Sequence, residues 1–264
     1  MQGHAPLPIS AASPDFQIKL AESAADLRAA QRLRYEVFVT ELGGAGAGVD
    51  HDQRLETDAF DPFFDHLMLL DRARAPKDQV VGVYRLLRAD QAAAMGQYYS
   101  EDEYDLRVLK ASGRKLLELG RSCLHRDYRG GTAMFELWSG LAAYVARHGI
   151  EILFGVASFH GTDPAALAQP LSLLHHAYRA PPELRVTSRA FQRMDLIPQA
   201  QIDRRAAMVG TPALIKAYLR LGGLVGDGAY VDHVFNTIDV CLVMDTARLN
   251  DRQRQIYAKA GGGL

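Results

Sequence analysis

The stretch from Leu116 to His148 constrains the fold of this 264-residue chain more than any other. It begins with a run of mostly apolar residues, Leu116–Leu124, whose length suits a buried strand. The turn Arg129-Gly130-Gly131 follows, and after it apolar residues recur at helical spacing: Phe135, Leu137, Trp138, Leu141, Tyr144 and Val145. A helix that starts after such a turn directs backbone N–H groups and the positive end of its dipole at an anion. The stretch therefore predicts a strand, an anion-binding turn and a helix.

Two opposite charges, Glu118 and Arg121, interrupt the apolar strand. Burial is costly for either charge alone, so each needs a partner. Because the two residues are three positions apart, they face opposite sides of an unbroken strand. Two alternatives stay open: a β-bulge between them, or a separate partner for each. Bulges are common beside active sites, and a buried Glu118 whose pKa is set by burial and charge is a candidate general base.

Composition and charge exclude several classes of protein. Hydrophobic residues make up 48% of the chain and charged residues 23%, which is ordinary for a globular protein. A net charge of −1 gives no indication of nucleic-acid binding. Cys123 and Cys241 both lie in apolar runs, which predicts buried free thiols in a reducing compartment. No secretory signal and no apolar run of about 18 residues is evident, so a cytoplasmic location is expected.

Pattern and turn signals predict one domain, residues 15–250, between tails at 1–14 and 251–264. Strands are predicted at Phe16–Leu20, Leu67–Asp71, Val80–Leu87, Ile152–Phe159 and Asp239–Asp245. Helices are predicted from a Ser23 cap to Leu42, over Pro164–Tyr178 and over Thr211–Leu221, with Ser100 and Glu103 as a further candidate cap. The region Pro181–Ala207 receives no assignment. Mixed strands with helices between them indicate an α/β or α+β fold.

Acidic residues are concentrated after the glycine-rich segment Gly43–Gly48. Asp58, Asp61 and Asp65 gather directly before an apolar strand. Loops of this length are uncommon unless they are functional or disordered. Two interpretations stay open: a solvated surface loop, or a site that holds a cationic substrate.

Other charged or titratable residues are weaker candidates. Arg85 lies within an apolar strand and needs an anion or a carboxylate if it is buried. His66 opens a strand, where a single histidine is more often structural. No metal site is predicted, because His175 and His176 are adjacent and point in different directions on their helix. Ser158 lies in no nucleophile motif.

Ordered motifs over roughly Gln31 to Met244 resemble the ornithine N-acyltransferases, bacterial enzymes of ornithine-lipid synthesis. These in turn resemble the acyl-homoserine-lactone autoinducer synthases of the GCN5-related N-acyltransferase (GNAT) fold. The segments that carry the resemblance are LRYEVFVTELG (Leu33–Gly43), Asp65-His66-Leu67, VGVYRLLR (Val81–Arg88), LELGRSCLHRDYR (Leu117–Arg129), FGVASFHGTDP (Phe154–Pro164), PALIKAYLRLGG (Pro212–Gly223) and VDHVFNTIDV (Val231–Val240). The resemblance implies a central mixed sheet flanked by helices, with an elaborated C-terminal half.

The resemblance also implies a reaction. A 3-hydroxyacyl chain passes from acyl carrier protein to the α-amine of L-ornithine, which gives lyso-ornithine lipid. Glu118 matches the residue proposed to deprotonate the amine. The residues expected to bind the acceptor are Arg34, Asp58, Asp61, Asp65, His66, Arg85, Arg121 and Ser158. The residues expected to bind the donor are Ser122, Cys123, Arg129, Gly130, Gly131, Thr132 and Ala133.

The donor loop departs from the pattern of enzymes that use acetyl-CoA. Arg129 is kept, but Thr132 and Met134 stand where two small residues are expected. This departure favours the phosphopantetheine of acyl carrier protein, with its single phosphate, and no permanently bound cofactor is expected. The alternatives are an acyl-homoserine-lactone synthase, another N-acyl amino acid synthase, or a non-catalytic module that binds acyl carrier protein. A long-chain product implies peripheral contact with the inner membrane.

Overall fold

The computed structural model describes residues 13–46 and 48–249. These ranges cover the predicted domain except for residues 47 and 250. The predicted tails, 1–14 and 251–264, lie outside the described residues apart from Ser13 and Pro14. Within the described ranges, Cys123 and Cys241 are buried and free, as their apolar surroundings predict.

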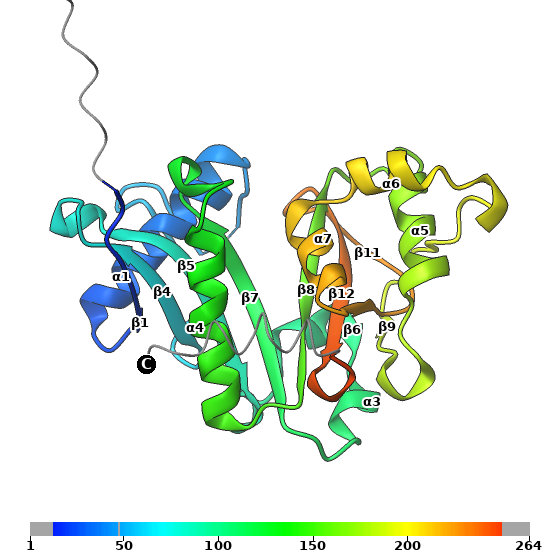
Figure 1. Cartoon of the computed structure of the whole chain (residues 1–264), viewed down its shortest axis with the longest axis horizontal. Helices are drawn as coiled ribbons and strands as arrows, with labels where there is room; N and C mark the ends of the chain where they lie inside the picture. The colour runs from blue at the N-terminus through cyan, green and yellow to red at the C-terminus, as the bar shows by residue number, and fades with distance from the viewer. Residues whose placement is uncertain (1–12, 47, 250–264) are drawn as a thin grey trace, which may run out of the picture.

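An eight-stranded mixed sheet forms the centre of the protein (Figure 1). The strand order is β1-β4-β5-β7-β8-β12-β10, and β11 pairs with β12. Neighbouring strands are antiparallel except β7 and β8, which are parallel. The strands are β1 (Phe16–Leu20), β4 (Asp65–Asp71), β5 (Val80–Arg88), β7 (Leu116–Leu124), β8 (Ile152–His160), β10 (Leu224–Val225), β11 (Tyr230–Asp232) and β12 (Thr237–Asp245). The predicted mixed sheet is therefore confirmed.

Two further pairs of short strands form separate two-stranded sheets: β2 (Val49–Asp50) with β3 (Leu55–Glu56), and β6 (Tyr104–Asp105) with β9 (Thr187–Ser188). The α-helices are α1 (Ala24–Arg34), α2 (Ala89–Met95), α3 (Arg107–Lys110), α4 (Ala133–His148), α5 (Ala168–Tyr178), α6 (Arg204–Gly210) and α7 (Ala213–Arg220). A π-helical segment η1 (Tyr35–Glu41) continues α1. Short 3₁₀ turns are η2 (Pro76–Asp78), η3 (Tyr99–Asp102), η4 (Arg126–Tyr128), η5 (Pro182–Leu184), η6 (Gln199–Gln201) and η7 (Thr246–Arg248).

Helices cover both faces of the sheet because the strands alternate their apolar side chains between the two faces. In β4, Leu67 and Leu69 pack in one cluster with Leu137 of α4. Met68, between them, packs in another cluster with Leu33 of α1. Successive side chains of a strand point to opposite faces, so α1 and α4 lie on opposite sides of β4. Figure 1 shows α4 crossing in front of β4, β5 and β7.

The first helix begins at the predicted Ser23 cap but does not stay α-helical to its predicted end. Ser23 caps α1, since its hydroxyl accepts a hydrogen bond from the backbone N–H of Asp26. The sequence predicted one helix to Leu42, but the last turns widen into the π-helical segment η1. Bulky and β-branched residues fill this segment, YEVFVTE, and such residues lose side-chain freedom in a regular α-helix. Helical segments of this kind are frequent at functional sites.

The predicted start of the helix after β8 was wrong. The Thr162-Asp163-Pro164 signal makes a turn, in which Asp163 accepts from the backbone N–H of Ala165, and α5 begins only at Ala168. Pro170 explains the difference. It lacks a backbone N–H, so it is tolerated in the first turn of α5 but would break a hydrogen bond inside a helix that started at Pro164.

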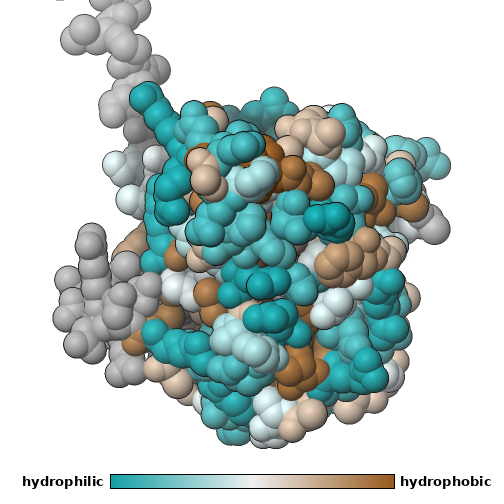
Figure 2. All heavy atoms as spheres, turned by 90° about the vertical axis from the view of Figure 1, so that its right-hand side faces the viewer, coloured by the Kyte–Doolittle hydropathy of each residue, from teal (hydrophilic) through white to brown (hydrophobic). Residues whose placement is uncertain are grey.

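Hydrophilic and hydrophobic residues are interspersed on the face that α5 and α6 help to form (Figure 2). None of the described helices is both long enough and apolar enough to span a membrane. The large hydrophobic side chains that are exposed, among them Phe135, Phe191 and Val209, come from different elements.

Candidate active site

The strands β7 and β8 pair only at their first residues and then diverge. Their register runs from Leu116 opposite Ile152 to Glu118 opposite Phe154, while both strands continue for several residues beyond. At the next position in β8, a Cβ on Gly155 would lie 2.1 Å from the carbonyl oxygen of Leu119. Glycine is therefore needed for the strands to approach this closely at the point where they separate. Figure 1 shows the resulting fork between β7 and β8.

A β-bulge in β7 changes the direction of the strand beside the fork. The register with β5 shifts so that Arg121 and Ser122 lie opposite the single residue Tyr84. Arg121 has a φ angle of 48°, which a residue with a side chain adopts only when its surroundings impose it. Of the two alternatives left open by the sequence, the bulge is present, and Glu118 and Arg121 also have separate partners.

A cavity of about 430 Å³ opens at the fork. Strands β7, β8 and β12, the end of β11, the turn η3 and the segment η1 all contribute to its wall. Its charged lining residues are Glu56, Glu103, Glu118, Arg121, Asp232 and Asp239. The predicted base Glu118 lines this cavity together with Arg121 and Ser158 from the predicted acceptor set and Ser122 from the predicted donor set.

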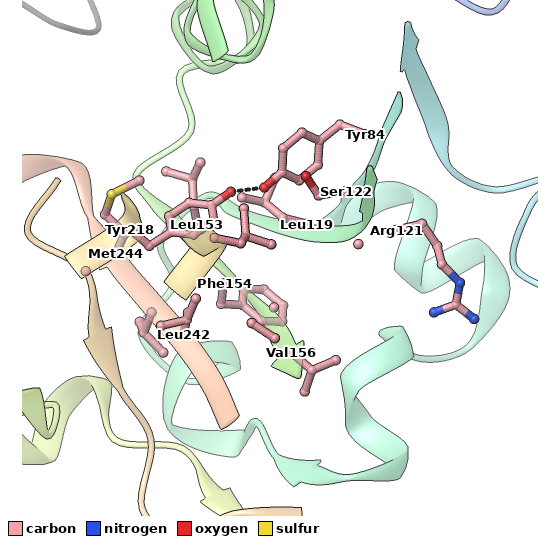
Figure 3. A pocket seen from close by; sticks show the side chains of 16 residues that line it. Tyr84, Leu119, Arg121, Ser122, Leu153, Phe154, Val156, Tyr218, Leu242 and Met244 are labelled. Atoms are coloured by element: carbon pink, nitrogen blue, oxygen red, sulfur yellow. Dashed lines mark hydrogen bonds between the residues drawn. The ribbon is translucent and has the colours of Figure 1, made fainter. Parts of the chain in front are cut away.

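A second, smaller cavity of about 40 Å³ shares part of its wall with the first, including Leu119–Ser122 and Leu214 (Figure 3). Its lining is mostly apolar: Leu153, Phe154, Val156, Leu242 and Met244 are examples. At its edge the hydroxyl groups of Tyr84 and Tyr218 form a hydrogen bond (Figure 3). The fork therefore places a small apolar cavity beside a large one whose lining includes charged residues.

Glu118 is 1% exposed, and no arginine or lysine of the described chain bonds to its carboxylate. Instead, the start of η3 holds it. The backbone N–H of Tyr99 donates to Oε2 at 2.7 Å and that of Ser100 to Oε1 at 2.6 Å, while the Ser100 hydroxyl also donates to Oε1. Burial raises the pKa of Glu118 to about 7, although these donors and the charge of Arg85 oppose the rise. A carboxyl group with a pKa near 7 exchanges protons readily at neutral pH.

Beside Glu118, six charged side chains form a closed ring in which each arginine contacts two carboxylates. In order around the ring they are Arg34, Glu56, Arg121, Asp58, Arg85 and Asp61. Apart from the shorter Arg34–Glu56 contact, the N–O distances lie between 2.6 and 3.5 Å. Three positive and three negative charges thus balance within this arginine–carboxylate ring.

Within the ring, opposite charges hold Asp61 and Arg34 in their charged forms. Burial alone would raise the pKa of Asp61, but Arg34 and Arg85 hold it well below its usual range. Burial likewise lowers the pKa of Arg34, yet Glu56 and Asp61 raise it above the ordinary value. Because Asp58 and Asp61 already pair with arginines, this part of the acidic loop belongs to a buried ion-pair network and is not a solvated surface.

A different set of acids on the cavity wall has no such balance. Glu103, Asp232 and Asp239 each place a carboxylate oxygen within 4.8 Å of the others. Burial raises the pKa of Glu103 to about 8, and the nearby charges of Asp239 and Asp232 raise it further. Burial also raises the pKa of Asp239 to about 6, against the effect of hydroxyl groups of Ser158 and Thr237. We refer to these three residues as the acid triad.

Six of the eight residues predicted for the acceptor site do not line the cavity: the ring members Arg34, Asp58, Asp61 and Arg85, and also Asp65 and His66. Asp65 pairs with Arg88 and accepts a hydrogen bond from the Tyr144 hydroxyl at 2.6 Å. His66 is buried, and its Nε2 lies 3.0 Å from the carbonyl oxygen of Asp61. Burial lowers the pKa of His66, so the imidazole is neutral at pH 7. Neither residue lines the cavity, and His66 supports the acidic loop.

The predicted donor loop also lies outside both cavities. The Arg129 side chain donates to the carbonyl oxygen of Leu124 at 2.9 Å and pairs with Glu41 at 2.8 Å. Gly130 has a φ angle of 79°, which glycine adopts without strain. Gly131, Thr132 and Ala133 complete the start of α4, and a role for this loop in phosphate binding stays a prediction. The Cys123 side chain is buried in the cluster under α1.

Sequence patterns did not reveal the residues that complete the site. They indicated a helix cap at Ser100 and Glu103, which was wrong: Ser100 holds Glu118, and Glu103 lines the cavity. Asp239 alternates with apolar residues in a predicted strand, so only its charge marked it. Neither the histidines nor the cysteines mark a metal site in the sequence, whereas carboxylates distant in sequence converge here.

Comparison with known proteins supports the fold and the family. Residues 33–139 match the family model described as an acetyltransferase (GNAT) domain. Among solved structures, the acyl-homoserine-lactone synthase LasI superposes with a TM-score of 0.52 at 16% identity, covering 94% of this chain and 96% of that one. FeeM, an N-acyl amino acid synthase from uncultured soil microbes, gives 0.52 at 13% identity, covering 94% and 98%. The predicted GNAT fold is therefore confirmed.

Curated sequences give a closer match. An L-ornithine N(alpha)-acyltransferase of Rhodobacter capsulatus is 58% identical over 253 residues, which cover 95% of this chain and 98% of the relative. An L-ornithine N(alpha)-acyltransferase of Brucella abortus is 42% identical over 248 residues, covering 92% and 88%. The similarity thus extends over nearly the whole of both chains, well beyond the matched domain.

Proposed function

The chain belongs to the family of the L-ornithine N(alpha)-acyltransferases, and from this membership we propose that it transfers a 3-hydroxyacyl chain from acyl carrier protein to the α-amine of L-ornithine. The product is lyso-ornithine lipid. The structural observation that carries the proposal is the position of Glu118. It is a buried carboxylate at the wall of the fork cavity, without an ion-pair partner in the described chain.

Glu118 is proposed to accept the proton that the α-ammonium must lose before its nitrogen can attack. With a pKa of about 7, Glu118 is partly deprotonated at neutral pH and strong enough as a base to assist this step. The amine nitrogen then attacks the thioester carbonyl, the C–S bond breaks, and the thiol leaves with a proton while the amide forms. The hydrogen bonds from Tyr99 and Ser100 fix the carboxylate in place.

The donor thioester is proposed to lie in the fork between β7 and β8. Past Glu118, β7 no longer pairs with β8, so its edge is open to a ligand there. Backbone N–H groups near Ser122 and Cys123 are the candidates for stabilising the tetrahedral oxyanion. Phosphopantetheine of acyl carrier protein, held near Arg129 and Gly130, would bring the thioester to this point. The amphiphilic product gives a reason for peripheral contact with the inner membrane.

The test is an acceptor-dependent release of thiol. Purified protein is incubated with 3-hydroxyacyl carrier protein and a panel of amino acids, and the product is identified by mass spectrometry. Thiol release with L-ornithine, together with an Nα-acyl product, is expected. Release with S-adenosylmethionine in place of ornithine would support an acyl-homoserine-lactone synthase. Tight carrier-protein binding without release for any acceptor would support a binding module.

A further inference from the structure

Two buried oxygens of the acid triad lack hydrogen-bond partners among the described residues, whereas both carboxylate oxygens of Glu118 accept hydrogen bonds. Glu103 is 8% exposed and Asp239 is 4% exposed, so both are more than nine-tenths buried. Among the described residues, no hydrogen-bond partner reaches Oε2 of Glu103 or Oδ1 of Asp239. Unsatisfied buried carboxylate oxygens are costly, and a native site that keeps two of them indicates a missing ligand.

The charge of the triad also lacks compensation within the described part of the chain. Arg121 is the positive charge that acts on both Glu103 and Asp239, but its ion pairs are with Glu56 and Asp58 of the ring. Asp232 uses Oδ1 to accept from the backbone N–H groups of Val234 and Phe235, which adds no positive charge. The triad therefore offers up to three negative charges to a ligand that enters the cavity.

We propose that the acid triad binds the side-chain ammonium of the acceptor and so determines selectivity for diamino acids. This inference rests on the proposed function, since it assigns the second amine of the same acceptor. An ammonium group carries three N–H donors and no acceptor, which suits three carboxylates whose oxygens lie within 4.8 Å of one another. Charge-assisted hydrogen bonds of this kind are the stronger ones in proteins.

The turn η3 relates this ammonium site to the proposed base. Its first backbone N–H groups, from Tyr99 and Ser100, hold Glu118, and Glu103 is the residue that ends the turn. Both carboxylates line one cavity. A diamino acid can therefore present its α-nitrogen to Glu118 and its second nitrogen to Glu103 and Asp239 without leaving the cavity. The cavity volume of about 430 Å³ suits an organic acceptor rather than a single ion.

The experiment compares L-ornithine with L-norvaline, which has the same carbon chain without the terminal ammonium. The variants are Glu103→Gln and Asp239→Asn, singly and together, with Asp102→Asn as the control. Asp102 is next to Glu103 and exposed, and it is absent from the cavity wall. Values of kcat/KM with 3-hydroxyacyl carrier protein are measured for both acceptors, and calorimetry gives the affinity of each acceptor for the same proteins.

The wild type is expected to prefer L-ornithine, and each single variant to lower the ornithine-to-norvaline ratio of kcat/KM by about tenfold to a hundredfold. Asp102→Asn keeps the wild-type ratio. A purely structural role for the triad would reduce both acceptors equally and leave the ratio unchanged, which would overturn the inference. The Asn and Gln variants remove the negative charge but keep the volume of the side chain, and a thermal melt verifies that they are folded.

The calorimetric measurement of acceptor affinity tests this inference independently of the proposed function. If wild type binds L-ornithine more tightly than L-norvaline, and the triad variants abolish the difference, the inference stands even if no acyl transfer occurs. Equal binding of the two acceptors to wild type overturns it, whatever the catalytic result. Stoichiometric binding of Mg²⁺, Mn²⁺ or Ca²⁺ that Glu103→Gln abolishes, with an unchanged acceptor ratio, would show a metal site and also overturn it.

Discussion

The arginine–carboxylate ring and the acid triad each contain three buried or half-buried acids, yet their electrostatics differ. All three acids of the triad line the fork cavity, whereas of the ring acids only Glu56 does. In the ring, Arg34, Arg85 and Arg121 neutralise the acids, and the pKa of Asp61 is held well below its ordinary value. In the triad, no arginine or lysine of the described chain forms an ion pair, and the pKa of Glu103 rises to about 8.

Charge alone therefore does not identify a binding site. In a balanced buried network the charges compensate one another and support the architecture, whereas an unbalanced network leaves its charge available to a ligand. Glu118 is a third case, because neutral N–H and O–H donors hold it without cancelling its charge. The three kinds of carboxylate match the three roles proposed for them: support of the fold, proton transfer and recognition of the acceptor.

The ring can be disrupted by removing a single arginine, and this is the largest effect that we expect. Arg34 is 0% exposed, so Arg34→Met leaves Glu56 and Asp61 buried without one of their partners. The free energy of unfolding is expected to fall by about 3–5 kcal/mol in urea denaturation at pH 7. Arg107→Met, which removes an exposed arginine paired with Asp105, is the matched control and should change little.

A loss for Arg34→Met no greater than that of the Arg107 control would show that the ring does not support the fold. The free energy of unfolding of a triad variant tests the contrast between the ring and the triad directly. Asp239→Asn removes a buried acid that has no cationic partner in the described chain, so it should not destabilise the protein at pH 7. Equal losses for Arg34→Met and Asp239→Asn would erase the distinction between the two regions.

Replacing the carboxylate that neutral donors hold should affect turnover rather than folding. Glu118→Gln keeps the volume of the side chain but removes the base, so kcat is expected to fall by about 10²- to 10⁴-fold. The thermal midpoint should stay close to that of wild type, which is the internal control. Single-turnover thiol release with L-ornithine gives the rate. Unchanged turnover would remove Glu118 from the mechanism and leave the fork without a base.

The pH profile gives a smaller effect with a defined sign. Burial raises the pKa of Glu118 to about 7, and only the deprotonated form accepts a proton. We therefore expect kcat/KM for L-ornithine to rise about tenfold per pH unit below 7 and to flatten above it. Glu118→Gln should remove this step from the profile. A wild-type profile that is flat between about pH 5.5 and 7.5 would contradict the assignment.

The sequence predicts the fold and the base but not the triad, and the physical reasons are clear. Hydrophobic periodicity found β7 and α4 because one period governs a whole element. Glu118 was found because it is a charge within an apolar strand. Glu103 lies in a polar stretch that looks like an ordinary turn, and Asp232 is a single acid beside a short apolar run. The two acids converge only through contacts between segments more than 100 residues apart in sequence. Periodicity carries no information about such contacts.

The acid triad makes a last prediction, on stability against pH. The pKa of Glu103 is about 8 in the folded protein, because burial and Asp239 disfavour its charged form, and it returns to an ordinary value near 4.5 on unfolding. A group whose folded pKa is raised stabilises the fold fully below its unfolded pKa and loses that contribution as pH rises toward its folded pKa.

Wild type should therefore lose stability between about pH 4.5 and 8, whereas Glu103→Gln should lose less. At a pH of about 8 the variant is therefore expected to be more stable than wild type. L-Ornithine at saturating concentration should reduce this difference in the free energy of unfolding, because its ammonium group compensates the negative charge of the wild-type triad. An equal difference with and without L-ornithine would show that the triad does not bind the acceptor.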